Sequence, residues 1–146
     1  MRNIEYLFII LAGILIFVLS SLLVYKYINK GIQQDAYKKS LDSFYRLHSS
    51  IEDVCRSFTG EKRVLYIYVS ERVSKIFSEK DKLCVIADND KKCLDTTCNL
   101  NQFSIVYNTS EFYLQTYGKD LQTYMVEIEK VYGNTVNIRY KPYITE

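Results

Sequence analysis

The feature that most constrains the fold is a long uncharged run near the N-terminus, from Tyr6 to Tyr25. As a helix, about twenty residues at 1.5 Å rise span roughly 30 Å, the thickness of the hydrocarbon core of a bilayer. A cleavable secretory signal has a shorter apolar core and a small-residue cleavage site, which the residues around Ser20 and Ser21 do not supply. The run therefore predicts a retained membrane-spanning helix.

The residues that follow Lys26, roughly 120 in number, are enough for one small domain and too few for two. We expect a transmembrane or assembly helix over residues 1–27 and one extracytoplasmic domain over residues 28–146. The formal net charge is only +2, and basic and acidic residues are interspersed along the chain. This charge pattern argues against a nucleic-acid partner.

All four cysteines lie outside the uncharged run. Their even number predicts two disulfides and an oxidising compartment. Two alternatives remain open, a metal site and free thiols, although the spacing lacks the close cysteine pair typical of zinc ligands. Of the three possible pairings we favour Cys93 with Cys98 inside one loop, and Cys55 at the helix end with Cys84 on a strand. The four residues are Cys55, Cys84, Cys93 and Cys98.

The signals for membrane topology conflict. Lys26, Lys30, Lys38 and Lys39 follow the uncharged run, and the positive-inside tendency alone would place the domain in the cytoplasm. The cysteines favour the outside, as does the sequon Asn108-Thr109-Ser110, a glycosylation candidate. We give the cysteines more weight, because a short basic leader before Met1 would reverse the charge count. We expect a single-pass cell-membrane protein with its C-terminal domain outside.

A heptad pattern indicates that the helix continues beyond the membrane segment, from Ile4 to Phe58, before Gly60 ends it. A single sheet with one apolar face needs a cover, and the stripe on the helix is the only obvious candidate. The stripe should therefore lie against the sheet. Lys38, Lys39 and Asp42 should be exposed on the other faces. The stripe consists of Tyr37, Leu41, Phe44, His48, Ile51, Cys55 and Phe58.

After Gly60 the periodicity is that of strands. Five or six mostly antiparallel strands are expected within residues 64–141, forming one small sheet. The expected strands are Val64–Val69, Leu83–Ala87, Phe103–Tyr107, Phe112–Tyr117 (ended by Gly118), Tyr124–Val131 and Thr135–Tyr140. Residues 72–78 are ambiguous between helix and extended chain, and residues 91–102 are expected to be a loop. The predicted fold class is α+β, one long N-terminal helix on a small antiparallel sheet.

This combination resembles the type IV pilin superfamily. The run Ile4-Glu5-Tyr6-Leu7, followed by apolar residues, resembles the archaeal branch with class III signal peptides, whose processed subunits often carry a glutamate–tyrosine pair here. Residues 65–73, LYIYVSERV, resemble a segment common in archaeal pilin-like proteins. The resemblance covers residues 1–58 as a pattern and the sheet only loosely.

The resemblance implies an assembly role for Glu5 and for the amine of Met1. Family subunits polymerise through the N-terminal helix, and the glutamate at the fifth mature position is thought to meet the N-terminal amine of a neighbour. Met1 stands where a processed subunit begins, which leaves open an upstream coding region, a mature form or an unprocessed relative. A plainer interpretation also stays open, in which Glu5 sits among headgroups and is favoured by the helix dipole.

No catalytic arrangement is evident, so we expect neither an enzyme nor a cofactor or metal site. His48 is the single histidine, and no phosphate-binding loop is present. Two functions are carried forward. The first is a structural subunit of a pilus-like surface filament that associates with itself or with other pilin-like subunits. The second is a signal-anchored extracytoplasmic binding or accessory domain that does not polymerise.

The 14 tyrosines are a further feature of the composition. On a small sheet some of them should be exposed, and exposed tyrosine suits contacts between subunits, with sugars or with surfaces, as in adhesion. Ordinary strand composition explains them equally well.

Overall fold

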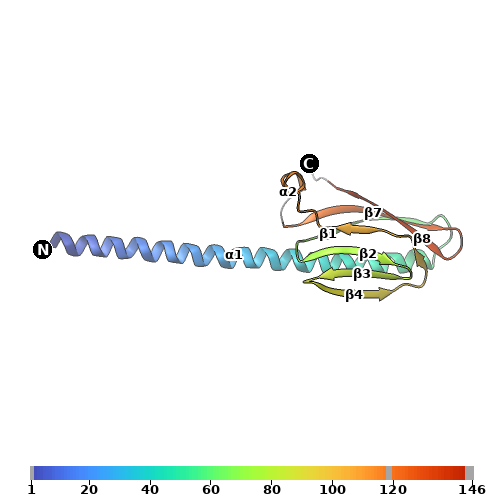
Figure 1. Cartoon of the computed structure of the whole chain (residues 1–146), viewed down its shortest axis with the longest axis horizontal. Coiled ribbons are helices and arrows are strands. Elements are labelled where there is room, and N and C mark those ends of the chain that lie inside the picture. Colours follow the sequence, from blue (N-terminus) through green and yellow to red (C-terminus); the bar gives the residue numbers. More distant parts are fainter. Residues whose placement is uncertain (1, 118–119, 144–146) are drawn as a thin grey trace. The chain divides into compact units, whose positions relative to one another are not determined.

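The computed structural model describes residues 2–117 and 120–143 (Figure 1). Within these residues, the long helix α1 (Arg2–Cys55) is followed by strands that form two sheets and by one short helix, α2 (Glu111–Tyr117). The architecture is α+β, with the long N-terminal helix packed against small, antiparallel-rich sheets, and the predicted fold class is confirmed.

Residue contacts divide the chain into two compact units, Met1–Gln34 and Asp35–Glu146. In the first unit, every side chain that the structure describes from Glu5 onward is exposed. The second unit contains the rest of α1, both sheets and α2. The hydrophobic core therefore belongs to the second unit.

Helix α1 ends three residues earlier than predicted. Its last turn closes with a bond from the Ser57 N–H to the Val54 carbonyl (3.1 Å), and the chain then turns through Gly60 at a φ of +90°. The Gly60 N–H donates to the Lys130 carbonyl (2.8 Å), which draws the chain into the sheet. Phe58 is consequently 88% exposed, and its predicted place in the buried stripe was wrong.

The first sheet has the strand order β1-β7-β8-β5. Its strands are β1 (Lys62–Val69), β7 (Gln122–Val131), β8 (Thr135–Pro142) and β5 (Asn99–Leu100). Strands β1, β7 and β8 pair in antiparallel fashion, whereas the short β5 pairs in parallel with β8. Gly133 and Asn134 lie in the connection between β7 and β8, and Gly133 adopts a φ of +80° that favours glycine there.

The second sheet has the strand order β4-β3-β2-β6 and is antiparallel throughout. Its strands are β2 (Val73–Glu79), β3 (Lys82–Ala87), β4 (Asp90–Asp95) and β6 (Ser104–Val106). Asp88 and Asn89 form the turn between β3 and β4, both with positive φ. The single sheet expected from the sequence was wrong, since the described residues contain two four-stranded sheets.

Two segments differ from their predicted structure. Residues 91–102, expected to be a loop, contribute most of β4 and all of β5. The sequence of β4, DKKCLD, is mostly polar because this strand lies at the sheet edge with little apolar burial. Residues 112–117, expected to be a strand, lie in α2, which Ser110 caps by accepting from the Tyr113 N–H (3.4 Å). Gly118, expected to end that strand, lies outside the described residues.

The second half of α1 supplies the centre of the core. Phe44, Leu47, Ile51 and Val54 are fully buried in one cluster with apolar residues of both sheets. The covering role predicted for the heptad stripe is confirmed, although Tyr37 and Leu41 are only half-buried. Leu47 and Val54 widen the stripe beyond the predicted positions. The residues predicted to be exposed, Lys38, Lys39 and Asp42, are exposed.

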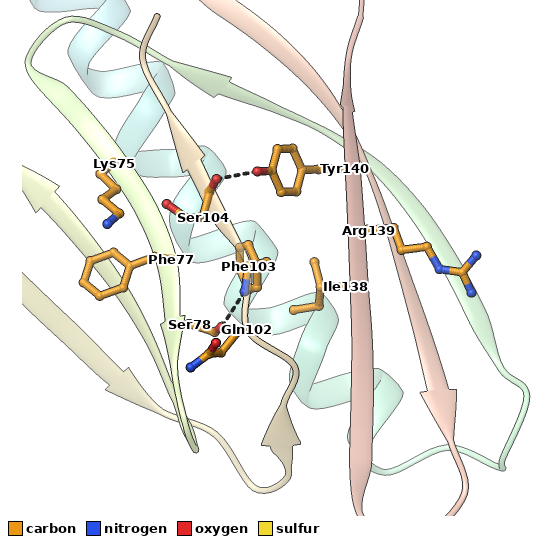
Figure 2. Close-up of a pocket in the computed structure, with 9 residues that line it drawn as sticks. All are labelled: Lys75, Phe77, Ser78, Gln102, Phe103, Ser104, Ile138, Arg139 and Tyr140. Atoms are coloured by element: carbon orange, nitrogen blue, oxygen red, sulfur yellow. Dashed lines mark hydrogen bonds between the residues drawn. The ribbon is translucent and has the colours of Figure 1, made fainter.

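The two sheets meet along β6 and β8, which do not pair with each other as strands (Figure 2). The Tyr140 hydroxyl donates to the Ser104 carbonyl (2.5 Å). The Asn101 side chain donates to the Ile138 carbonyl (3.0 Å) and accepts from the Ile138 N–H (2.7 Å), as a neighbouring strand would. This seam leaves a cleft between the two sheets.

Candidate functional site

The N-terminal half of α1 is the site that the sequence predicts for assembly. Glu5 lies in the first turn of the helix and is exposed. The large apolar side chains that follow it, from Tyr6 to Tyr25, are each exposed by 49% or more. Met1, the other predicted assembly residue, lies outside the described residues.

This half of the helix is a candidate membrane span. A stretch of it reaches a mean hydropathy of 3.0, and none of that stretch is buried within the chain. Its two serines do not interrupt the apolar surface. The Ser20 hydroxyl donates to the Ile16 carbonyl (2.9 Å) and the Ser21 hydroxyl to the Phe17 carbonyl (2.8 Å). Both hydroxyl protons are thus satisfied inside the helix, which suits a lipid environment.

All four cysteines form disulfides, but the predicted pairing was wrong. The bonds are Cys55–Cys98 and Cys84–Cys93. Cys93 lies on β4 directly opposite Cys84 on β3, with the two Cα atoms 4.1 Å apart. The expected pairing assumed that Cys93 shares a loop with Cys98. Because residues 90–95 are a strand instead, Cys93 is held against Cys84.

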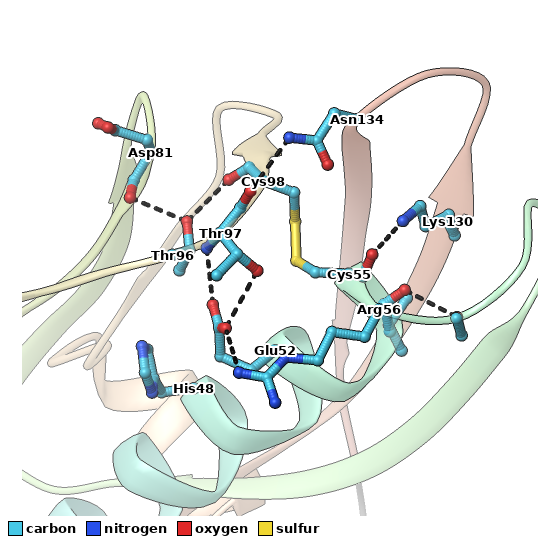
Figure 3. The surroundings of a disulfide bond; sticks show 12 residues. His48, Glu52, Cys55, Arg56, Asp81, Thr96, Thr97, Cys98, Lys130 and Asn134 are labelled. Carbon is cyan, nitrogen blue, oxygen red and sulfur yellow. Dashed lines mark hydrogen bonds and ion pairs between the residues drawn. A yellow bond between two sulfur atoms is a disulfide. The ribbon is translucent and has the colours of Figure 1, made fainter.

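The Cys55–Cys98 bond joins the last residue of α1 to the segment before β5 (Figure 3). The two Cα atoms are 5.8 Å apart, and 43 positions separate them in sequence. The Lys130 ammonium also donates to the Cys55 carbonyl, one of the carbonyls that a helix end leaves unpaired. The end of α1 is therefore tied to the segment before β5 and to β7, two parts of the first sheet.

Polar contacts reinforce this tie one turn earlier in the helix. The Glu52 carboxylate accepts from the Thr97 N–H (2.8 Å) and hydroxyl (3.1 Å), and Asn134 donates to the Thr97 carbonyl (3.0 Å). His48 Nε2 lies 2.8 Å from the Asp95 carbonyl. The His48 side chain is half-buried. No sequence pattern pointed to Glu52 or Thr97, because the two residues are 45 positions apart.

A second tie lies at the opposite end of the domain helix. The Arg72 guanidinium stands 4.2 Å from the centre of the Tyr37 ring and forms a two-bond ion pair with Asp88 (2.7 and 2.8 Å). The hydrogen bond from Arg72 lowers the pKa of the Asp88 carboxyl, and the same bond raises the pKa of Arg72. This exposed cluster links α1, the start of β2 and the β3–β4 turn.

Three potential metal ligands approach one another on the outer face of the second sheet. Ligand atoms of Glu79, Cys84 and Cys93 lie within 4.8 Å of one another. The two sulfur atoms are bonded to each other, so neither is the thiolate that a metal would need. The Glu79 carboxylate pairs with Lys91, and this hydrogen bond lowers the pKa of Glu79. The disulfide and the ion pair instead hold the edge strand β4 to β3 and β2.

Asn108, the glycosylation candidate, is exposed in the loop between β6 and α2. Its side-chain oxygen accepts from the Ser110 N–H (2.9 Å). Its backbone forms a reciprocal pair with the buried Gln122 side chain, which accepts from the Asn108 N–H (2.8 Å) and donates to its carbonyl (2.7 Å). The sequon is thus held on a fixed backbone with its asparagine facing outward.

The comparisons with known proteins do not identify the chain. No protein family, curated protein sequence or solved structure matches it.

Proposed function

We propose that this protein is a structural subunit of a type IV pilus-like surface filament or a related assembly, polymerising through its N-terminal helix. The observation that carries the proposal is the contrast within α1. Residues 5–35 bury no described side chain, whereas the following turns complete the core of a disulfide-bonded domain. A subunit that polymerises through a helix needs such an unfilled apolar surface next to a domain that is already complete.

In this proposal Glu5 sets the register between neighbouring helices. A carboxylate in apolar surroundings attracts an opposite charge far more strongly than in water, and either charge alone is costly there. Its exposure in the single chain leaves it free to meet the N-terminal amine of another subunit. Only the correct register would bring the two charges together.

We place the domain outside the cell membrane. The two disulfides support this, because such bonds persist in oxidising compartments. The lysines that follow the apolar run favour the opposite orientation, and protease accessibility of the domain on intact cells decides between them. Complete protection of the domain would contradict the proposed topology.

The test of the register role is Glu5→Gln, which removes the charge and keeps the size. The variant should insert and fold normally, because the Glu5 side chain is exposed in the single chain. In the assembled state, breaking one side of an enclosed ion pair should cost about 3–5 kcal/mol. The measurement compares the membrane-bound subunit with sheared surface filaments from the native host, in which the filament fraction should fall sharply.

Asp42→Asn is the matched control, since Asp42 is an exposed acid on the domain half of the same helix. It should leave the filament yield unchanged. Equal yields from Glu5→Gln and the wild type would contradict the register role and return Glu5 to the headgroup interpretation.

The alternative is a signal-anchored accessory domain that never polymerises. The same apolar helix would then serve as a membrane anchor alone. In that case the subunit would be absent from sheared filaments in the wild type as well, which separates the two proposals.

A further inference from the structure

The seam between the two sheets contains a cleft of about 590 Å³, within the size range of roughly 300–1,000 Å³ typical of small-ligand sites. It lies entirely in the disulfide-bonded domain, between β2, β6 and β8. Its lining residues are Lys75, Phe77, Ser78, Gln102, Phe103, Ser104, Ile138, Arg139 and Tyr140.

The strand register brings the polar and aromatic groups of the cleft to one side. Phe77 on β2 pairs with Ser104 on β6, so their side chains project from the same face. Lys75, two residues before Phe77, shares that face and places its ammonium 4.8 Å from the centre of the Phe77 ring. In Figure 2, Gln102 lies on the same side of β6, and Tyr140 reaches toward Ser104 from the other side.

Several of these side chains have charges or hydrogen-bonding groups that no other described residue pairs with. In the described part of the chain, the half-buried Lys75 forms no ion pair, and the Gln102 amide and the Ser104 hydroxyl form no hydrogen bond. The Arg139 guanidinium points away from the cleft and pairs with Glu129 at 2.9 Å. The cleft therefore presents one ammonium without an ion-pair partner, one free amide and one free hydroxyl beside the Phe77 ring. The Lys91 ammonium, which is paired with Glu79, also lies 5.4 Å from the centre of that ring.

The chemistry of the lining residues favours some classes of ligand and excludes others. None of the nine lining residues is acidic, so the cleft favours an anion over a cation. A single free ammonium is too little charge for a nucleic-acid backbone. An added peptide strand is excluded, because the Ile138 N–H already donates to the Asn101 side chain and the Tyr140 hydroxyl already donates to the Ser104 carbonyl across the seam. A pyranose ring suits the cleft, because it offers an apolar C–H face to aromatic rings and hydroxyls to amide and hydroxyl groups.

We propose that this cleft binds an acidic sugar, a pyranose ring that carries a carboxylate, as in a uronic acid residue of a polysaccharide. Lys75 pairs with the carboxylate, Gln102 and Ser104 bind ring hydroxyls, and Phe77 and Tyr140 contact the ring. The site does not depend on polymerisation, so it would serve a filament subunit and an anchored accessory domain equally.

The test measures binding to the full chain in detergent micelles by isothermal titration calorimetry. The probe is trigalacturonic acid, compared with its fully methyl-esterified form at constant ionic strength. Binding of the acid and a loss of roughly tenfold or more in affinity on esterification are expected, since the ester removes the charge that Lys75 recognises. This comparison needs no protein variant, so misfolding cannot imitate it.

Lys75→Gln should weaken binding of the acid by a similar factor, and Gln102→Ala by a smaller one. Lys141→Gln is the matched control, because it removes the same charge from β8 on a residue that does not line the cleft. Equal loss from Lys75→Gln and Lys141→Gln would overturn the site in favour of general charge attraction. If sodium sulfate competed as well as the sugar, the cleft would be a general anion site and the acidic-sugar proposal would be wrong. The absence of any binding of trigalacturonic acid at millimolar concentration would also overturn the proposal.

Discussion

The two halves of α1 are both rich in apolar residues but distribute them differently. From Tyr6 to Tyr25 the apolar side chains surround the helix, and all of them are exposed. From Ala36 to Cys55 they form one stripe, and that stripe is buried beneath two sheets while charged residues occupy the other faces. A stripe can be satisfied by one domain, whereas a helix that is apolar all round must be surrounded by lipid or by other helices.

The same difference explains why the disulfides and polar cross-links are found in the domain rather than along the first half of the helix. Both disulfides and the Glu52–Thr97 contact lie in or beyond the second half of the helix. Among the described side chains of residues 5–34, the hydrogen bonds are the back-bonds of Ser20 and Ser21 to the helix itself. We infer that folding free energy is concentrated in residues 35–143, and that the first half depends on its surroundings.

The largest expected effect comes from two phenylalanines that the heptad pattern treats as equivalent. Phe44→Ala should lower the free energy of unfolding of the domain by about 3–5 kcal/mol, because the ring is fully buried. Phe58→Ala should change it by less than about 0.5 kcal/mol, because that ring is 88% exposed. Urea unfolding of the full chain in mild detergent measures both. Similar losses of unfolding free energy for the two variants would contradict the assignment of Phe44 to the core and Phe58 to the surface.

The two disulfides should differ in the stability they provide. A cross-link over 43 positions restricts the unfolded chain more than one over 9 positions. Chain-entropy estimates are roughly 4 kcal/mol for Cys55–Cys98 and roughly 2.5 kcal/mol for Cys84–Cys93. The pairs Cys55→Ala with Cys98→Ala and Cys84→Ala with Cys93→Ala, unfolded in parallel, test the order. A larger loss from the second pair would contradict it.

The smallest expected effect concerns the exposed Arg72–Asp88 pair. Because the pKa of Asp88 is lower when folded, the pair stabilises the domain above the unfolded pKa of about 3.9. This contribution disappears as pH falls through the lower folded pKa. Asp88→Asn should therefore reduce the melting temperature slightly at pH 6 and not at pH 2. An equal reduction at both values would assign the effect to the β3–β4 turn instead of the charge.

Periodicity predicted those parts of the fold in which one face is buried. The spacing of Phe44 and Ile51 located the covered half of the helix, and alternation located β7. Strand β1 was located by its β-branched and aromatic residues. The stripe failed at Phe58, because a seven-residue repeat drifts around a 3.6-residue helix and the helix ends first. Strand β4 was missed because its lysines lie at an exposed edge, where alternation carries little signal.

The site residues were predictable only where chemistry is local. Glu5 stands out because it adjoins an uncharged run, and the cysteines because of their type. The disulfide pairing was not predictable, since it follows from Cys93 being on a strand. Lys75, Ser104 and Tyr140 were also missed as a group, because residues up to 65 positions apart meet only through the order of strands in two sheets.

The most direct test of the filament proposal is photo-crosslinking from the exposed half of α1 in the native host. A photoreactive amino acid at Leu15 lies in the middle of that half, and one at Tyr45, exposed on the domain half, serves as the comparison. Sheared filaments and membranes are then analysed by mass spectrometry. The proposal predicts that Leu15 crosslinks to the apolar N-terminal helix of a second subunit in the filament fraction. Crosslinks from Leu15 to lipid alone, with no subunit in sheared filaments, would contradict it.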